Sequence, residues 1–237
     1  MTLQALLFDC DGVLVDTERD GHRVAFNQAF KSAGLEVEWS VEEYSVLLEV
    51  AGGKERMKHY FDGRGWPNEI HDRDGFVKDL HRSKTDKFMD LVLAGDMKLR
   101  LGVRGLIAEA FGDGIPVAVC STSNVRAVQG IVDEVIGGDL APNIQVFAGD
   151  MVSIKKPDPA IYLLGAQTLS VEPQKCVVIE DSHIGLMAAK SAGAQCVVTK
   201  STYTQNEDFS KADIVTDDLS AGQVDLATCR ALVQNLG

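Results

Sequence analysis

The chain has 237 residues and a formal net charge of −12, and its composition, 45% hydrophobic and 24% charged, is ordinary for a globular protein. Because general binding to nucleic acid or to an anionic membrane needs a basic face, the acidic balance argues against both partners. A chain of this length holds one large domain, or a core domain with a smaller inserted one.

The five cysteines fit a reducing compartment. Their number is odd and none of them forms a C-x-x-C pair, so structural zinc and a disulfide framework are not favoured. Most lie in or beside apolar segments, which predicts buried free thiols. We expect neither a signal peptide nor a membrane span, since no segment shows the required apolar length. The cysteines are Cys10, Cys120, Cys176, Cys196 and Cys229.

Short apolar segments alternate with helical patterns along most of the chain. The alternation predicts strands at 3–8, 115–120, 144–147, 176–179 and 194–199, with a weaker one at 213–215. It predicts helices at 103–112, 124–136, 158–169 and 183–192. Apolar strands that alternate with helices are typical of a parallel sheet covered on both faces. We therefore expect an α/β fold whose core domain comprises residues 1–17 and 99–237.

Residues 18–98 break this alternation. They contain no convincing buried strand and show amphipathic helical patterns at 18–33, 41–49, 54–63 and 75–94. The sequence therefore predicts an α-helical cap domain, residues 18–98, inserted after the first strand.

Polar or charged groups follow four of the predicted strands. The segments are "DCDG" (9–12), "STSN" (121–124), "KKPDP" (155–159) and "EDS" (180–182). Each of them alone is an ordinary turn or helix-cap signal. Parallel strands end at the same edge of a sheet, where ligands bind in such folds, so the four segments together predict a functional site.

Four acids would meet at this edge, namely Asp9, Asp11, Glu180 and Asp181. Carboxylates this close repel one another and raise one another's pKa. A hard divalent cation with oxygen ligands resolves the conflict, and a site that keeps water and a substrate phosphate suits Mg²⁺.

The other groups at this edge suit an anion. Ser121 and Thr122 offer hydroxyls, and the turn after them opens a helix whose free N–H groups favour phosphate. Either Lys155 or Lys156 supplies a positive charge. A metal, hydroxyls and a lysine at one edge indicate a phosphoryl-transfer site, in which charge stabilisation does most of the work.

In order, spacing and strand context these motifs resemble those of the haloacid dehalogenase superfamily, in the branch with a helical cap after the first strand. The resemblance implies a Rossmann-like core in which Asp9 attacks the substrate phosphorus and Asp11 acts as general acid and base. Dehalogenases of this superfamily lack an acid at the position of Asp11, because a halide leaving group needs no proton. Asp11 therefore favours phosphate esters.

The same resemblance assigns the ligands of the site. It implies that Mg²⁺ is bound by the side chains of Asp9 and Asp181 and by the backbone carbonyl of Asp11. Glu180 is either a further direct ligand or a residue that supports the ligands from behind. It implies that the phosphate is held by Ser121 and by Lys156, which directly precedes a proline as in the family pattern. The further substrate-binding residues of this motif are Thr122, Ser123 and Asn124.

A closer resemblance extends into the cap. "DTERDGHRVAFNQAF", "AGGKERMKHYF" and "VIEDSHIGLMAAKSAG" resemble segments of the CbbY-type phosphatases. These enzymes accompany Rubisco and hydrolyse its inhibitory by-product xylulose-1,5-bisphosphate to xylulose-5-phosphate. The resemblance implies a monomeric phosphatase for this sugar bisphosphate in a plastid stroma or a bacterial cytoplasm.

A sugar bisphosphate has a second phosphate, for which the cap would have to supply cations. Adjacent glycines would let the backbone approach that phosphate closely. The alternative is that these are ordinary surface helices with solvated charges, which applies above all to Arg56 and Arg82. The candidate residues are Gly52, Gly53, Lys54, His81, Arg82 and Lys84.

Three acidic or basic residues lie around the start of the cap. Glu18 is a candidate acceptor for substrate hydroxyls, or else a first-turn helix acid. We expect His22 to be a half-buried helix residue and Asp16 to be a capping or turn residue outside the site.

Other functions remain open. A sugar-phosphate mutase similar to β-phosphoglucomutase would share Asp9 and Asp11 and would differ in how the cap excludes water. A phosphatase for phosphoglycolate or for a sugar monophosphate is a second alternative. A non-catalytic regulatory protein with this fold would have lost a motif residue, and none of the motif residues is missing.

Overall fold

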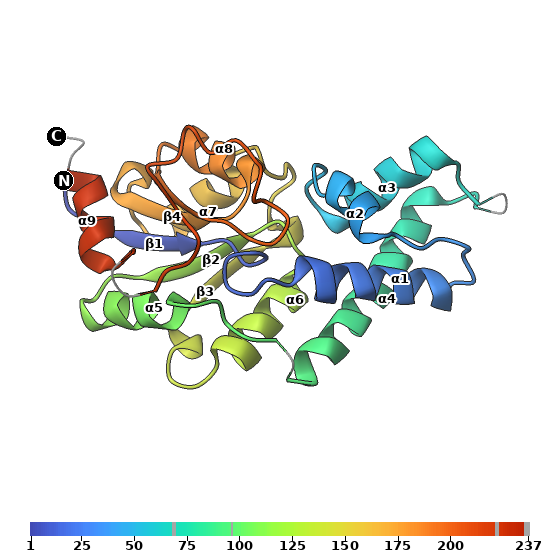
Figure 1. The fold of residues 1–237 in the computed structure, drawn as a ribbon, viewed down its shortest axis with the longest axis horizontal. Coiled ribbons are helices and arrows are strands. Elements are labelled where there is room, and N and C mark those ends of the chain that lie inside the picture. The colour runs from blue at the N-terminus through green and yellow to red at the C-terminus, as the bar shows by residue number, and fades with distance from the viewer. Residues whose placement is uncertain (68–69, 96, 221–222, 235–237) are drawn as a thin grey trace.

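The computed structural model describes residues 1–67, 70–95, 97–220 and 223–234. The core is a sheet of six parallel strands in the order β3-β2-β1-β4-β5-β6 (Figure 1). The α/β fold, the five predicted strands and the weaker sixth are confirmed. The strands are β1 (Ala5–Phe8), β2 (Val117–Ser121), β3 (Gln145–Ala148), β4 (Cys176–Glu180), β5 (Gln195–Thr199) and β6 (Ile214–Thr216).

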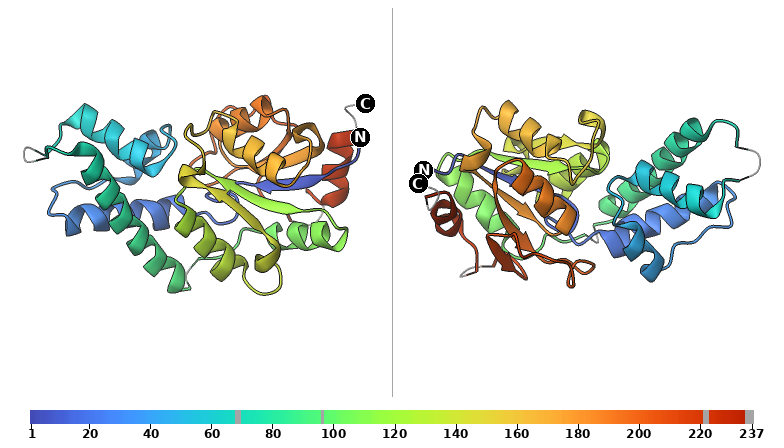
Figure 2. Two further views of the ribbon diagram at one scale, coloured as in Figure 1. Left: turned by 180° about the vertical axis from the view of Figure 1, so that it is seen from behind. Right: turned by 90° about the horizontal axis from the view of Figure 1, so that it is seen from above.

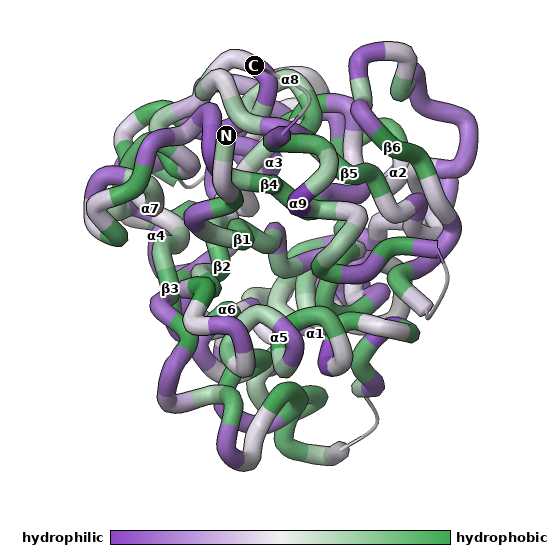
Figure 3. The backbone as a smooth tube through the Cα atoms, turned by 90° about the vertical axis from the view of Figure 1, so that its left-hand side faces the viewer, coloured by the Kyte–Doolittle hydropathy of each residue, from purple (hydrophilic) through white to green (hydrophobic). Residues whose placement is uncertain are grey.

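Helices cover both faces of the sheet, which explains why its central strands are apolar up to their carboxyl ends, where β2 closes on Ser121 and β4 on Glu180. Leu6 and Phe8 of β1 face the cluster that contains α5 (Val103–Gly112), α6 (Val125–Gly130) and α9 (Leu226–Gln234). Leu7 faces the opposite cluster, with α7 (Ala160–Thr168) and α8 (His183–Ser191). In Figure 3 the strands of the sheet are drawn mainly in the hydrophobic colour. Buried strands of this kind place their ends, and whatever follows them, at one edge.

Two features of the core differ from the predicted helices. The predicted helix 124–136 is α6 followed by a π-helical turn over Ile131–Ile136, and α9 was not predicted. The five cysteines are buried free thiols, as predicted. Among the described residues, no helix combines the length and the apolar character that crossing a membrane would need.

Residues 18–98, for which we keep the name cap, fold into helices at the carboxyl end of the sheet (Figure 2). A π-helical turn over Glu18–His22 leads into α1 (Arg23–Ser32), which is followed by α2 (Val41–Leu47), α3 (Gly53–Arg64) and α4 (Arg73–Leu93). The cap has an aromatic cluster of its own, with Phe26, Phe30 and Trp39 at its centre.

Helix α4 connects the cap to the core. Its first half packs into the aromatic cluster of the cap through Val77 and Leu80. Its second half packs into the main core cluster through Phe88 and Val92. The long helix therefore belongs to both parts, and the predicted boundaries at 17/18 and 98/99 stay a prediction.

Candidate active site

A cavity of about 460 Å³ lies between the carboxyl edge of the sheet and the cap. Residues from all four predicted strand-end segments line it, together with residues of the cap. The structure brings most of the predicted site residues to its wall: Asp9, Asp11, Glu18, Gly52, Gly53, His81, Lys84, Ser121, Thr122, Ser123, Asn124, Lys156 and Asp181. Lys54, Arg82 and Glu180 do not line this cavity.

Asp9 follows β1 directly and is bonded to a lysine from a distant segment. The Nζ of Lys156 donates to Asp9 Oδ1 at 2.7 Å and to Glu180 Oε1 at 2.7 Å, and all three side chains are buried. Burial raises the pKa of Asp9 to about 7, together with the charges of Glu180 and Asp11 and against the charge of Lys156. One lysine therefore serves two buried carboxylates, which leaves this end of the cavity short of positive charge.

Glu180 supports Lys156 from behind the cavity. It is completely buried and accepts hydrogen bonds from Lys156, from the hydroxyl of Tyr162 and from the backbone N–H of Asp181. The ring of Tyr162 lies 4.8 Å from Lys156 Nζ. Of the two roles predicted for Glu180, a direct metal ligand or a residue that supports the ligands, its bonds to Lys156 and Tyr162 favour the second.

A metal ion could be held by acids at this end. Oxygen atoms of Asp9, Glu180 and Asp181 lie within 4.8 Å of one another. Burial raises the pKa of Asp181 well above its usual range, and the charges of Glu180 and Asp9 raise it further. Hard oxygen ligands with an excess of buried negative charge fit a divalent cation such as Mg²⁺.

Gly12 lets Asp181 reach this site. Its φ of +77° is in the left-handed region, and a Cβ at this position would overlap Oδ2 of Asp181. The turn around it is closed by a hydrogen bond from the Gly12 N–H to the carbonyl of Val15. The glycine of "DCDG" is thus required both by the turn and by the neighbouring carboxylate.

Asp11 is held by three donors. Thr17 Oγ1 donates to its Oδ1 at 2.7 Å, His22 Nε2 lies 2.6 Å from the same oxygen, and Ser123 Oγ donates to Oδ2. Burial alone would raise the pKa of Asp11, but His22, Ser123 and Thr17 together hold it below its usual range. In the substrate-free protein Asp11 is therefore ionised, and its three hydrogen-bond donors make it a weak base.

His22 was predicted to be half-buried, and this prediction is wrong. Its side chain is 3% exposed and stacks on Phe88 at 4.0 Å between ring centroids. The Nζ of Lys84 lies 2.6 Å from His22 Nδ1, so a charged Lys84 leaves the proton on Nε2, where it is donated to Asp11. Burial lowers the pKa of Lys84 to about 8.

The "STSN" segment follows β2 and lies beside residues 9–12, which we call the nucleophile loop after the role predicted for Asp9. Ser121 Oγ accepts a hydrogen bond from the N–H of Ser123, which in turn reaches Asp11. Asn124 is the N-cap of α6, where its side chain accepts from the N–H of Arg126. Asn124 thus combines the ordinary capping role with a place on the cavity wall.

The cap wall contains a chain of polar contacts. Arg56 is only 7% exposed and donates to the Leu47 carbonyl at 3.0 Å and to the hydroxyl of Tyr44 at 3.0 Å. Tyr44 donates in turn to Glu18 Oε2 at 2.5 Å. The interpretation of Arg56 as a solvated surface residue is therefore wrong, because it is a buried cation on the wall of the cavity.

Gly53 and His81 meet where α3 begins. A Cβ on Gly53 would lie 2.6 Å from Nε2 of His81, so the glycine makes room for the imidazole. Burial lowers the pKa of His81 to about 3, helped by the charges of Lys84 and Lys54. The N-cap residue of α3 is Gly52, which has no side chain to cap the first turn, so the N–H groups of that turn begin beside His81 at the cavity wall.

Two predicted cap residues are engaged elsewhere. Lys54 forms an ion pair with Asp150 of the core, and exposed Arg82 pairs with Asp79 one turn earlier in α4.

Lys155, the neighbour of Lys156, donates to the carbonyl of Gly149, so the choice of Lys156 as the lysine of the site agrees with the geometry.

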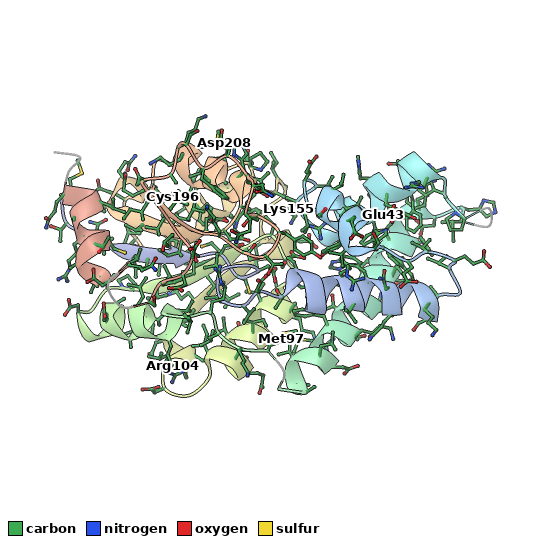
Figure 4. All side chains as sticks on the ribbon, in the orientation of Figure 1. Glu43, Met97, Arg104, Lys155, Cys196 and Asp208 are labelled. Atoms are coloured by element: carbon green, nitrogen blue, oxygen red, sulfur yellow. The ribbon has the colours of Figure 1, made fainter. Side chains whose placement is uncertain are left out.

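One wall of the cavity was not predicted. Ser201, Tyr203, Thr204, Glu207 and Asp208 line it from the loop after β5, and Figure 4 labels Asp208 of this loop. Asp16, predicted as a residue outside the site, accepts from the N–H and the hydroxyl of Thr202 in the same loop. The available signal was that a polar segment follows the predicted strand 194–199 at the same sheet edge as the other four.

Comparisons with known proteins agree with this geometry. A family model described as haloacid dehalogenase-like hydrolase matches residues 3–193. The CBBY-like protein of Arabidopsis thaliana is 53% identical over 237 residues, which cover 97% of this chain and 74% of that protein. Protein CbbY of Cereibacter sphaeroides is 40% identical over 92% of this chain and 93% of its own length.

Solved structures give the same result. The crystal structure of CbbY from Rhodobacter sphaeroides in complex with phosphate superposes with a TM-score of 0.88 at 39% identity, covering 96% of this chain and 99% of that chain. A mutant of that protein in complex with xylulose-(1,5)bisphosphate also gives 0.88, at 38% identity and the same coverage. A β-phosphoglucomutase from Clostridium difficile, with a TM-score of 0.81 and 20% identity, shares the fold. The chain belongs to the haloacid dehalogenase-like hydrolases, and among them it is a CbbY-like phosphatase.

Proposed function

We propose that this phosphatase hydrolyses xylulose-1,5-bisphosphate to xylulose-5-phosphate in a Mg²⁺-dependent reaction. The observation that carries the proposal is the pair of cationic groups on facing walls of one cavity: Lys156 beside the nucleophile, and Arg56 with Lys84 on the cap. A sugar with one phosphate would use only the first of these. The complex of the Rhodobacter sphaeroides relative with this bisphosphate supports the choice.

In the first step, a carboxylate oxygen of Asp9 attacks phosphorus and forms an aspartyl phosphate. The P–O bond to the sugar breaks, its electron pair stays on the sugar oxygen, and Asp11 supplies that oxygen with a proton. Asp11 must first take up this proton, which the negative charge of a bound phosphate next to it favours. The hydrogen bonds from Thr17 and His22 keep Asp11 pointed at the leaving group.

In the second step, water hydrolyses the aspartyl phosphate. Asp11, now a carboxylate, takes a proton from the attacking water, and the P–O bond to Asp9 breaks. Lys156, the hydroxyl of Ser121 and the N–H groups of the loop before α6 would neutralise charge on the phosphoryl oxygens. Asp9 and Asp181 would hold Mg²⁺ together with the Asp11 carbonyl, and when bound the ion neutralises phosphoryl charge and orients the ester.

The cap would hold the phosphate that is not cleaved. Arg56 and Lys84 are buried cations on the cavity wall, and the uncapped N–H groups of α3 at Gly53 suit an anion. Glu18, fixed by Tyr44, would accept hydrogen bonds from sugar hydroxyls. Lys54 would contribute by joining the cap to Asp150 of the core, and Arg82 is assigned no direct contact.

A substrate panel tests this function. Phosphate release should be compared for xylulose-1,5-bisphosphate, ribulose-1,5-bisphosphate, phosphoglycolate and β-glucose-1-phosphate, with and without Mg²⁺. We expect the highest kcat/KM for the first compound and activity only with the metal. No preference for xylulose-1,5-bisphosphate would contradict the substrate, and conversion of β-glucose-1-phosphate to its isomer would favour a mutase.

The covalent step has its own test. In Asp9→Asn the attacking carboxylate is missing, and we expect phosphate release to fall by about 10⁴-fold or more, as for the loss of other essential nucleophiles. The amide is similar in size, so circular dichroism should show an unchanged fold. Mg²⁺-dependent phosphatase activity that survives this change would show that the covalent mechanism is wrong.

We also propose that the protein is a monomer that acts in a plastid stroma or a bacterial cytoplasm. The relatives from Arabidopsis thaliana and Cereibacter sphaeroides support these two sources. Light scattering of the purified protein would test the first statement, and localisation of a tagged chain in its own cells would test the second.

A further inference from the structure

Arg100 lies on the segment that returns from the cap to the core, between α4 and α5 (Figure 1). Its backbone N–H donates to the carbonyl of Leu14 at 2.8 Å, so the outgoing and returning linkers of the cap run side by side here. It is not among the residues that line the active-site cavity. Arg100 can therefore influence the site through its hydrogen-bonded neighbours and through its charge, which acts on Asp181.

The guanidinium of Arg100 donates to four backbone carbonyls. Nη1 donates to the carbonyl of Gly12 and to that of Thr199 at 3.0 Å. Nη2 donates to the carbonyl of Lys200 at 2.6 Å and to that of Asp217 at 2.7 Å. One side chain thus connects the nucleophile loop, the end of β5 and the turn after β6.

These partners lie on either side of Asp181. Gly12 packs so closely against Oδ2 of Asp181 that a Cβ at this position would overlap the oxygen. On the other side, Ser201 directly follows Lys200, lines the same cavity as Asp181, and lies near enough to that carboxyl group to lower its pKa. By holding the carbonyls of Gly12 and Lys200, Arg100 fixes both surfaces against which the Asp181 carboxylate packs.

We propose that Arg100 is a positioning residue, which sets the place of Asp181 at the metal site and joins the returning linker of the cap to the nucleophile loop. This role rests on the proposed Mg²⁺-dependent function. The planar fork of arginine suits it, because lysine offers only a compact charge that cannot span four carbonyls. Side chains that orient metal ligands typically change metal affinity or activity by about 10- to 100-fold when they are removed.

Arg104 provides a matched control four residues later. It is also an arginine of the core that donates to a backbone carbonyl, that of Ile136, and it pairs with Asp139 at the surface. The variants to compare are Arg100→Lys, Arg100→Met and Arg104→Met. For each, we would measure Mg²⁺ binding calorimetrically without substrate, kcat and KM as functions of Mg²⁺ concentration, and Tm without metal.

For Arg100→Met we expect Mg²⁺ affinity to fall by about 10- to 100-fold, with a matching rise in the half-saturating Mg²⁺ concentration. KM at saturating Mg²⁺ should stay within about threefold, because Arg100 does not touch the cavity. The Mg²⁺ affinity of Arg100→Lys should lie between that of the parent and that of Arg100→Met. Arg104→Met should lower Tm and leave Mg²⁺ affinity unchanged.

Two results would overturn the proposal. One is Mg²⁺ affinity in both Arg100 variants equal to that of the parent, in which case Arg100 would serve only stability. The other is an equal loss of Mg²⁺ affinity in all three variants, which would indicate general loosening of the core. If Arg100→Met does not fold, Arg100→Lys decides between these outcomes. A parent protein that binds Mg²⁺ but has no Mg²⁺-dependent phosphatase activity would contradict the proposed function instead, and the binding comparison would still decide the role of Arg100.

Discussion

The two walls of the active-site cavity hold their charges in different ways. On the core wall, Lys156 and Asp9 are buried and bonded to each other, and Lys156 is also bonded to Glu180 behind the wall; each comes from the end of a strand or from the loop after one. On the cap wall, Arg56 is buried among helices and its partners are the neutral groups of Tyr44 and Leu47. The core wall thus resembles a fixed reaction centre. The cap wall offers a cation whose positive charge is not offset by these neutral partners and can bind an anionic ligand.

This difference predicts which changes harm catalysis and which harm binding. Changes in the core wall should act on kcat and on stability together, because its charges compensate one another. Changes in the cap wall should act mainly on KM for a substrate with two phosphates.

The largest effect should come from Lys156→Met. Removing the shared cation leaves two buried carboxylates without their common positive charge, which typically costs about 3–5 kcal/mol of unfolding free energy. Phosphate release should fall by at least about 10²- to 10³-fold, the usual effect of losing one donor to transition-state charge. Urea unfolding measures the loss of unfolding free energy, and steady-state kinetics measures the loss of phosphate release. The control is Lys155→Met, whose side chain is bonded to the Gly149 carbonyl, and equal losses in the two variants would contradict the assignment.

Gly12→Ala should be the next most harmful change. The new Cβ would meet Asp181, so we expect the half-saturating Mg²⁺ concentration to rise by about 10-fold or more. Gly34→Ala in the cap is the matched control, because its φ is also positive, at +70°, and nothing lies within 4 Å of its Cβ position. It should show only the cost of about 1–2 kcal/mol for a left-handed residue. Equal effects on Mg²⁺ dependence would mean that backbone strain alone is responsible.

Arg56→Met should act on binding. A hydrogen bond from a charged donor contributes about 1.5–3 kcal/mol, so KM for xylulose-1,5-bisphosphate should rise by about 10- to 100-fold. For a sugar with one phosphate, KM should change little. Arg82→Met, which removes an exposed ion pair with Asp79, should leave both values within about twofold. The idea fails if Arg56→Met raises KM equally for the two kinds of substrate.

The smallest effect concerns pH and His81. Its pKa of about 3 in the folded protein lies below the ordinary value of 6.5, so between these values the unfolded chain binds more protons. Stability should therefore be lost as the pH falls below about 6.5, by roughly 2 kcal/mol between pH 7 and pH 5. In His81→Gln this loss should disappear from urea unfolding curves. His59→Gln, on the exposed side of α3, is the control and should keep the slope of the parent.

Much of the core could be predicted because its signals are local. The central strands β1, β2 and β4 are buried on both faces, so each appears as a short apolar segment, and the polar residues after it must lie at the sheet edge. Asp9, Asp11, Lys156 and Asp181 could be found for this reason, and the motif order added their roles. The helical character of residues 18–98 followed from the same kind of periodicity.

The cap wall could not be predicted in the same way. Arg56 and Arg82 both lie on amphipathic helices with charged neighbours, and only the packing of α2 against α3 buries the first of them. The loop after β5 carries no motif, and its place at the cavity depends on where β5 lies in the sheet. A charged residue on a helix has many possible surroundings, and hydropathy patterns do not choose among them.

Hydrophobic periodicity and short motifs were enough to predict the succession of strands and helices along the chain except for α9, together with the inserted helices and the acids and lysine at the strand ends. Tertiary structure alone decided that His22 bonds Asp11, that Glu180 lies behind Lys156, and that Arg100 holds the nucleophile loop. Those contacts join segments that are 11, 24 and 88 residues apart. The physical reason is that a hydrogen bond depends on positions to within a few tenths of an ångström, which only the packed chain sets.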